Sequence, residues 1–517
     1  MTATLSTSPE ERVAPPSPGL RHVLRRGWRS LTSMRTALLL LFLLALAAVP
    51  GSLLPQRDLD PAAVRRYFVE RPALAPLFDR LYLFDVYASP WFAAIYLALM
   101  ISLVGCLAPR IRLHWRALRG RPPAPPKHLD RLAAYETWTT AVPPAEVEAA
   151  ARRALRRWRV VSHDCGLAAE RGYARESGNL VFHVALLTLL VGIGVGAGWG
   201  YQGAVLVVEG DTFVNTPAAY DELKPGRLNS VEDLPPFEVS LDDFRATYLA
   251  NGAPTSFAAD VRWRRSADDG ERRRTVKVNE PLTVDGARVY LLDHGYALHF
   301  TAKLPDGTVI YDQWQPFLPE RGDPNLASTG AVKITDIGGG LPDIGVRGLF
   351  APTLAVREGF AFSRYPEPRL PAFAYEVWAG DLGLGSGIPQ SVYDLDTSKM
   401  VRTGNGIVFP DQTVGRLPGG AELTFHGVKD FAVFQVTYDP GKWLVLGSAV
   451  AALTGLILSL RVRRRRVWVR ATPTEAGTLV EVGGLARQDA DAFAPELDSV
   501  AGRVAAGAPP IPDQKET

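Results

Sequence analysis

The sequence predicts an integral membrane protein with four transmembrane helices, a large extracytoplasmic all-β domain of sandwich or barrel-like form, and a small cytoplasmic α+β module between helices two and three. Two observations predict this fold class. Four long apolar stretches lack charged residues, and the block before the fourth alternates apolar and polar residues with a period of two. With 47% hydrophobic and 21% charged residues among 517, general disorder and fibrous repeats are excluded. The net charge of +3 gives no reason to expect a nucleic-acid partner, and two cysteines form no disulfide framework.

The first apolar stretch lies between Arg35 and Arg57, with no charged residue between them. A cleaved signal peptide is the alternative, because arginines precede a short apolar core. A span is favoured because the uncharged run continues to Gln56, far enough to cover the ~30 Å of hydrocarbon in a bilayer. The second stretch, residues 86–109, begins with aromatic residues suited to a membrane interface and ends at Pro109-Arg110.

The third stretch runs uncharged over residues 177–208, longer than a bilayer requires, so that only about 180–198 need be buried. The fourth covers residues 443–460 and stops at a cluster of arginines that begins with Arg461.

Arginine-rich segments before the first stretch, between the second and third, and after the fourth place both termini in the cytoplasm, by the positive-inside rule. The predicted segments are a cytoplasmic N-terminal tail 1–32, transmembrane helices 33–54, 89–108, 179–199 and 442–460, an extracytoplasmic loop 55–88, a cytoplasmic module 109–178, an extracytoplasmic domain 200–441, and a cytoplasmic basic cluster with a disordered tail 461–517.

The soluble parts differ in character. In the cytoplasmic module, residues 145–158 repeat apolar side chains at helical spacing. Their arginines either lie against the anionic inner leaflet or form the solvated face of a small helix-plus-hairpin module. In the outer block, turn signals at Asp285-Gly286 and Asp306-Gly307 separate alternating segments, which predicts antiparallel strands. Beyond about Ala471, weak periodicity and many Ala, Gly and Pro residues predict disorder.

His183 is the one histidine predicted within a span, about five residues, or ~8 Å, from its cytoplasmic end. An ionisable residue in hydrocarbon normally faces a protein interior, a cavity or a ligand. A neutral imidazole suits iron, and a flat apolar macrocycle would fill the space between helices. An interhelical hydrogen bond without any ligand is the alternative. Outside the membrane, His294 and His299 project to opposite faces of a strand, which argues against a shared metal.

Several motifs resemble the ResB family of cytochrome c biogenesis proteins. They cover residues from about 30 to 470, and the most specific is the run that leads into the third span, Gly172 to His183. The others are Ser33 to Leu38 with Pro50 to Arg57, Gly105-Cys106 with Pro109-Arg110, Asn279-Glu280-Pro281 with Val289-Tyr290 and Asp293 to Tyr296, and Trp443-Leu444 with Gly447-Ser448 and Arg466-Val467-Trp468.

The resemblance implies a membrane subunit of the system II pathway. With a ResC/CcsA-type partner, it carries heme b, bound non-covalently in transit, across the plasma membrane and supports attachment to the CxxCH motif of apocytochrome c. By matching position His183 is the axial ligand of the heme iron, with a second histidine from the partner. Arg175, just before the span, is a candidate contact for a heme propionate. Thiol-reducing proteins of the pathway are further implied partners. The tryptophan-rich motif of the ResC partner is absent, so the chain is half of a heme-lyase complex and is not expected to catalyse attachment alone.

A second function class stays open: an extracytoplasmic ligand-binding or sensory membrane protein in which His183 is structural. No kinase, cyclase or DNA-binding domain can be recognised in the cytoplasmic parts, so the sensory interpretation has less support. An independent transporter is disfavoured, because four spans with one histidine show no repeat or ion pathway.

Overall fold

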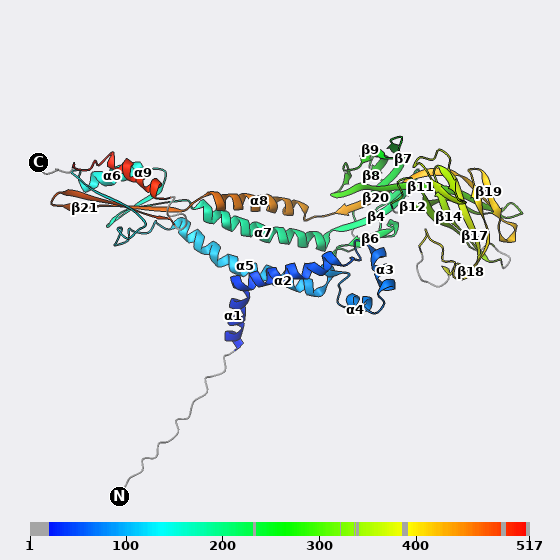
Figure 1. The fold of residues 1–517 in the computed structure, drawn as a ribbon, viewed down its shortest axis with the longest axis horizontal. Coiled ribbons are helices and arrows are strands. Elements are labelled where there is room, and N and C mark those ends of the chain that lie inside the picture. Colours follow the sequence, from blue (N-terminus) through cyan, green and yellow to red (C-terminus); the bar gives the residue numbers. More distant parts are fainter. Residues whose placement is uncertain are drawn as a thin grey trace, which may run out of the picture. The chain divides into compact units, whose positions relative to one another are not determined.

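The structure is a computed structural model that describes residues 20–230, 234–320, 322–335, 337, 341–384, 391–486 and 493–512 (Figure 1). It divides into two compact units, the first made of residues up to 192 and from 443 onward, the second of residues 193–442. Residues 1–19 of the predicted N-terminal tail lie outside the described residues.

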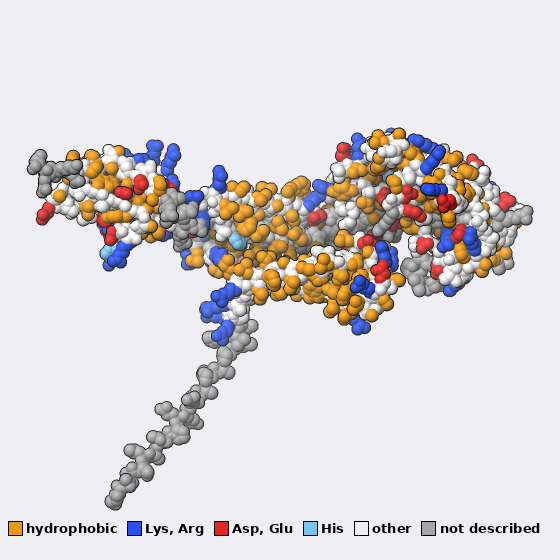
Figure 2. Space-filling view, in the orientation of Figure 1, with side chains coloured by type: hydrophobic (Ala, Val, Ile, Leu, Met, Phe, Trp, Pro, Cys, Tyr) orange, Lys and Arg blue, Asp and Glu red, His pale blue; other side chains and the backbone are white. Residues whose placement is uncertain are grey.

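Among the described residues, four helices are long and apolar enough to cross a membrane. They are α2 (Met34–Leu53), α5 (Pro90–Arg119), α7 (Ala174–Trp199) and α8 (Lys442–Arg461). Each coincides with a predicted span. Apolar side chains cover the surface of these helices, while lysine and arginine gather near their ends (Figure 2). Such a surface is suited to hydrocarbon rather than water.

Helix α5 continues ten residues past the proline at which the sequence predicts its end. Pro109 removes one backbone hydrogen bond, but a proline does not end a helix whose flanking turns are held by packing. Ser89 caps the start, since its hydroxyl oxygen accepts a hydrogen bond from the Phe92 amide at 3.2 Å. At 1.5 Å per residue the helix is about 45 Å long, so its basic last turns extend beyond a ~30 Å hydrocarbon layer.

Short helices complete the membrane-proximal part of the first unit. A basic helix precedes α2, and a small cluster around the buried Phe84 closes the loop between α2 and α5. These elements are α1 (Leu20–Leu31), α3 (Pro61–Glu70), α4 (Ala75–Arg80) and the 3-10 turn η1 (Val86–Ala88).

The rest of the first unit is a small module in which two helices accompany a five-stranded antiparallel sheet of order β1-β22-β21-β3-β2. Its elements are β1 (Ala134–Thr140), α6 (Pro144–Ala154), β2 (Arg159–His163), β3 (Gly166–Arg171), β21 (Arg465–Thr474), β22 (Gly477–Ala486) and α9 (Ala494–Ala505). Helix α6 buries Val147 and Ala151 in the module core, and Arg152 pairs with Glu148 on its outer side. This agrees with the helix-plus-hairpin interpretation of residues 145–158.

The prediction of disorder beyond about Ala471 is wrong for the described residues. Strand β21 lies at the centre of the sheet between β3 and β22, and α9 buries Leu497 and Val500 against it. The error has a physical cause, since these strands complete a core begun by a segment some 300 residues earlier in the sequence. Local periodicity carries no information about such a partner.

The second unit is built mainly of antiparallel strands. An eleven-stranded sheet has the path β18-β17-β14-β13-β12-β11-β20-β4-β6, with β10 beside β11 and β19 beside β20, and a four-stranded sheet has the order β5-β7-β8-β9. The strands are β4 (Tyr201–Val208), β5 (Thr212–Val214), β6 (Glu222–Pro225), β7 (Glu238–Tyr248), β8 (Pro254–Arg264), β9 (Arg272–Lys277), β10 (Leu282–Val284), β11 (Ala287–Lys303), β12 (Val309–Pro319), β13 (Ser328–Ile334), β14 (Asp343–Ala351), β15 (Leu354–Arg357), β16 (Phe360–Ser363), β17 (Ala372–Gly380), β18 (Met400–Val408), β19 (Gln412–Arg416) and β20 (Glu422–Tyr438), with 3-10 turns η2 (Pro217–Ala219) and η5 (Pro418–Gly420).

Two aromatic-rich cores hold this unit together. One surrounds Phe300, Phe317 and Phe373, and the other lies between β4, β7 and β20 around Phe237. The predicted turn at Asp285-Gly286 joins β10 to β11, and both residues have positive φ, 47° and 87°, as a type I′ hairpin turn requires. The predicted segments 288–292 and 298–303 form one continuous strand, β11, that supports both cores.

The ordered C-terminal segment can be tested with a charge in its core. We expect Val500→Asp, at a side chain that is 1% exposed, to destabilise the module by about 3 kcal/mol and to lower the amount of intact protein in membranes. The exposed neighbour Asp498→Ala is the control and should behave as the parent. Equal tolerance of both changes, measured by thermal unfolding and limited proteolysis, would contradict an ordered α9.

Candidate functional site

His183 lies on α7, and its ring is oriented by its own helix. The Nδ1 atom lies 2.7 Å from the Asn179 carbonyl oxygen, one turn earlier. Because a carbonyl only accepts, Nδ1 carries a proton, and in the neutral ring the lone pair is then on Nε2. The ring meets Phe182 edge-on, with centroids 5.3 Å apart. Orientation of one imidazole nitrogen by a hydrogen bond at the other is the arrangement found in metal-ligating histidines.

Helix α5 contacts α7 on both sides of this histidine. Seven residues before it, Glu176 and the adjacent Ser177 meet His114 of α5. Seven residues after it, the Leu190 carbonyl accepts a hydrogen bond from the Tyr96 hydroxyl of α5. Positions seven apart share a helix face, so His183 lies on the face of α7 that is held against α5 at both ends. The ring is half-buried.

Helix α8 packs closely against another face of α7. A Cβ atom at Gly178 would lie 2.7 Å from the Gly455 carbonyl oxygen, and one at Gly455 would lie 2.6 Å from the Phe182 amide nitrogen. Glycine is therefore required at both crossing points. Further along, the hydroxyls of Thr188 and Ser448 are 2.7 Å apart. Small residues and one polar pair fix α7 to α8, as is usual for helices that meet in an apolar medium.

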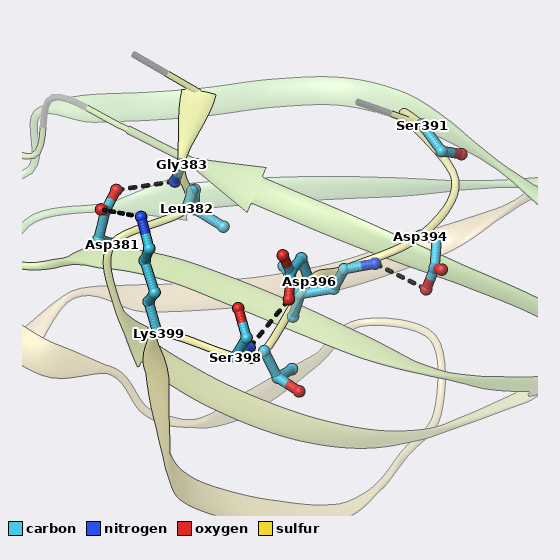
Figure 3. A pocket seen from close by; sticks show the side chains of 10 residues that line it. Asp381, Leu382, Gly383, Ser391, Asp394, Asp396, Ser398 and Lys399 are labelled. Atoms are coloured by element: carbon cyan, nitrogen blue, oxygen red, sulfur yellow. Dashed lines mark hydrogen bonds and ion pairs between the residues drawn. The ribbon is translucent and has the colours of Figure 1, made fainter. Parts of the chain in front are cut away.

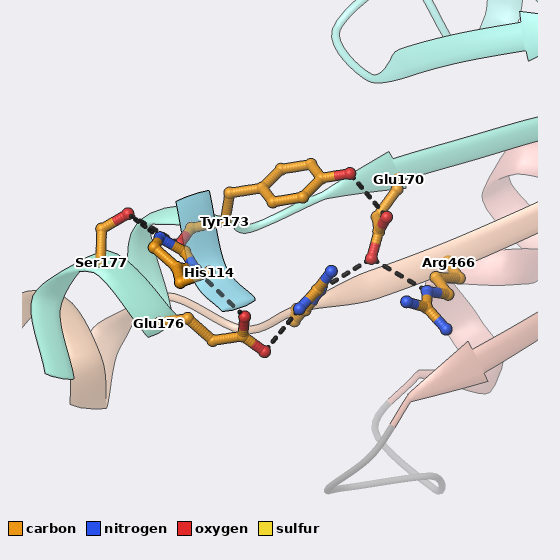
Figure 4. A network of polar contacts seen from close by, with 7 residues as sticks. His114, Glu170, Tyr173, Glu176, Ser177 and Arg466 are labelled. Atoms are coloured by element: carbon orange, nitrogen blue, oxygen red, sulfur yellow. Dashed lines mark hydrogen bonds and ion pairs between the residues drawn. The ribbon is translucent and has the colours of Figure 1, made fainter. Parts of the chain in front are cut away.

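A network of charged residues lies at the start of α7 (Figure 4). Its centre is Glu170 of β3, whose side chain is 2% exposed and accepts hydrogen bonds from the Tyr173 hydroxyl at 2.6 Å and from Nε of Arg464 and Arg466 at 2.7 and 2.9 Å. Arg464 also pairs with Glu176, which in turn meets His114. The network therefore joins the ends of α5, α7 and α8 to the module.

Electrostatics explains why a carboxylate is stable in this buried position. Burial on its own raises the pKa of Glu170, but the hydrogen bonds from Tyr173, Arg464 and Arg466 outweigh it, and the pKa lies below its ordinary value of 4.5. In the sequence alone, these arginines indicate only a positive-inside signal. One sequence signal could have identified Glu170: it is an acidic residue in an arginine-rich segment next to a predicted span.

Arg175, the candidate propionate contact, lies in the first turn of α7 and is half-buried. It precedes His183 by eight residues, about 12 Å along the helix axis. Its side chain is not free of other interactions. Its role toward a propionate stays a prediction.

The second unit contains a separate buried histidine. His294 is 7% exposed and is sandwiched between Phe244 and Phe257, with ring centroids at 4.9 and 4.7 Å. Burial lowers its pKa to about 4, so that it is neutral at pH 7. It lines an apolar pocket of about 350 Å³. His299 is on the other face of the same strand, stacked on Trp314, so the two histidines do not share a site.

A larger hollow of about 670 Å³ lies beside the loop that precedes β18 (Figure 3). Its carboxylates accept hydrogen bonds from amides of their own loop, Asp381 from Gly383 and Asp396 from Ser398. Such contacts are typical of turn formation. They satisfy the loop backbone and do not indicate a ligand site.

Comparison with known proteins agrees with the motifs. The ResB-like family matches residues 34–498. The cytochrome c biogenesis protein CcsB of Synechococcus sp. (strain WH7803) is 26% identical over 490 residues, 93% of this chain and 98% of its own length. CcsB of Synechococcus sp. (strain RCC307) is 28% identical over 498 residues, 93% and 96% of the two chains. CcsB of Gloeobacter violaceus is 28% identical over 304 residues, 56% and 61% of the two chains.

The charged network predicts a specific response to pH. Because the pKa of Glu170 is lower in the folded state, the unfolded chain binds more protons below about pH 4.5, and stability is lost as the pH falls through that region. We expect Glu170→Gln to cost about 3 kcal/mol at pH 7 and to weaken this acid dependence. Thermal unfolding of the detergent-solubilised chain measures both effects.

The matched control is Glu148→Gln, which alters an exposed pair with Arg152 in the same module. Exposed pairs contribute about 0–1 kcal/mol, so its melting temperature should stay near that of the parent. Similar behaviour of the two variants at all pH values would show that Glu170 does not stabilise the junction.

Proposed function

The chain belongs to the ResB-like family, and from this premise we propose that it acts in system II cytochrome c biogenesis as the membrane subunit that holds heme during its passage outward. In this proposal a ResC/CcsA-type protein is its partner, and apocytochrome c receives the heme at a CxxCH motif. The observation that carries the proposal is the Nε2 atom of His183, which has no hydrogen-bond partner among the described residues and lies within an apolar helix.

A neutral imidazole with an available Nε2 is the ligand type that heme iron binds. The hydrogen bond to the Asn179 carbonyl keeps a proton on Nδ1, so Nε2 is the ring atom left to ligate iron. Apolar side chains of neighbouring helices suit the porphyrin ring, while the basic start of α7 suits its propionates. Among the described residues no group of three or more histidine, cysteine or acidic side chains could hold a metal.

The same proposal includes the orientation of the chain. Arginines gather at the end of α5, the start of α7 and the end of α8, and all three ends meet in the module. By the positive-inside rule the module is then cytoplasmic, and the β-rich second unit is extracytoplasmic, on the side where apocytochrome c is matured.

Replacing the histidine tests the function directly. We expect His183→Ala to reduce covalently bound heme in cytochromes c by at least tenfold, while the protein stays in the membrane at its normal level, because only the axial nitrogen is removed. Heme staining of denatured membrane proteins measures the product. His128→Ala, an exposed histidine of the first unit, is the control.

The absorption spectrum of the chain purified with its partner provides a second measurement. A Soret band that disappears in His183→Ala but remains in His128→Ala is expected. Normal cytochromes c together with an unchanged Soret band in His183→Ala would refute heme ligation and favour a sensory protein with a structural histidine.

Orientation is tested by labelling single cysteines in intact cells with a membrane-impermeant maleimide. In a chain with Cys106 and Cys165 replaced by serine, Thr308→Cys, in an exposed turn of the second unit, should be labelled from outside. Glu475→Cys, in the exposed turn between β21 and β22, should be labelled only after lysis. The reverse pattern would overturn the topology.

A further inference from the structure

Three aromatic rings lie next to one another on the outer face of three neighbouring strands of the second unit, one ring on each strand. Trp314 of β12 is directly opposite His299 of β11, and His426 lies beside His299 on β20. The rings of His299 and Trp314 are stacked with centroids 4.8 Å apart, and those of the two histidines are 5.2 Å apart with a tilt of 40°. The residues next to these histidines in the sequence, Phe300 and Phe425, point their side chains into the core.

His426 is the extra residue of a β-bulge. His299 pairs with Gly427, whereas the next residue, Phe300, pairs with Phe425, so two residues of β20 are opposite one residue of β11. A bulge changes the direction in which its side chain points and costs ladder hydrogen bonds, and bulges are frequent next to functional sites.

Each histidine has a carboxylate at one ring nitrogen. Nε2 of His299 lies 2.8 Å from Oδ1 of Asp312, and Nδ1 of His426 lies 3.5 Å from Oδ1 of Asp411. No hydrogen-bond partner is found among the described residues for the remaining nitrogens, Nδ1 of His299 and Nε2 of His426. A carboxylate beside an imidazole orients the ring, as carboxylates do for metal-ligating histidines in proteins.

The separation of the rings fits a shared ion. With metal–nitrogen bonds of about 2.0–2.1 Å and a tetrahedral angle, the centres of two imidazoles on one ion lie about 5.2 Å apart. The observed 5.2 Å agrees with that separation. The local charge also favours a cation, since the carboxylates of Asp312 and Asp411 lie beside the two histidines. The Lys429 ammonium group lies above the Trp314 ring.

We propose that His299 and His426 form a binding site for a divalent late transition-metal ion, such as Cu²⁺ or Zn²⁺. Imidazole nitrogens suit these ions, and Cu²⁺ binds most tightly in the series. No third histidine, cysteine or acidic ligand completes the set among the described residues, so water or a bound molecule supplies the other positions. The site is independent of His183 and of the function proposed above.

The probe is Cu²⁺ added alone to the full-length, detergent-solubilised chain after removal of any histidine tag. We expect one tightly bound ion per chain, whose electron paramagnetic resonance and spin-echo modulation report two coupled imidazoles. His299→Ala and His426→Ala should each leave a signal from one imidazole or none and weaken binding at least tenfold. Asp312→Asn keeps both ligands and should weaken binding about 10–100-fold, as is usual for the loss of a supporting carboxylate.

His128→Ala is the matched control, because His128 is an exposed histidine beside a carboxylate, Asp130, but has no second histidine nearby. It should retain the two-imidazole signal. Circular dichroism of each variant checks that the β-rich unit is folded. A signal from a single imidazole in the parent, or unchanged binding in either His299→Ala or His426→Ala with folding intact, would overturn the proposal.

Discussion

The arrangement of the first unit depends on a constraint of apolar media: side chains that contact only hydrocarbon cannot fix the register of one helix against another. The register of α7, and with it the position of His183, is set instead by polar contacts and by glycine. Glu170 and its two arginines fix the start of the helix, Tyr96 fixes it near Leu190, and Gly178 with Gly455 allows α8 to approach. A shift of one residue would break all three sets of contacts together, so the imidazole has one position.

The small module has a structural role that follows from its composition. Its sheet is shared between the segment that joins α5 to α7 and the segment that follows α8, with β21 between β3 and β22. The ends of these three helices are therefore covalently attached to one hydrophobic core, and the buried Glu170 network lies where they enter it. A buried ion network contributes little net stability compared with apolar packing, but it tolerates only one geometry. Specificity of helix placement is thus the more reasonable explanation for its presence.

The sequence was sufficient for features that depend on local pattern. Charge-free length identified four long helices and placed His183 within one of them, and alternation with Asp-Gly turns identified antiparallel strands. It failed where partners are distant. The strand at 465–474 needs β3 for its core, and His426 meets His299 only through the pairing of β20 with β11. Helix α5 continues past Pro109 to His114, which contacts Glu176 and Ser177 of α7. The pairing of distant segments is a tertiary property, and residue spacing does not encode it.

His294 and His183 lie in environments with opposite chemical consequences. His294 is enclosed by phenylalanines and kept neutral by burial, so it contributes to packing over the whole physiological pH range. His183 is half-buried, with one nitrogen engaged and one available. Under the proposed function, a single available nitrogen is an advantage, because a carrier must release its cargo. With one axial bond from this chain and one from a partner, the complex binds the iron less tightly as soon as either protein moves. Two ligands on one chain would instead retain heme after the partner had left.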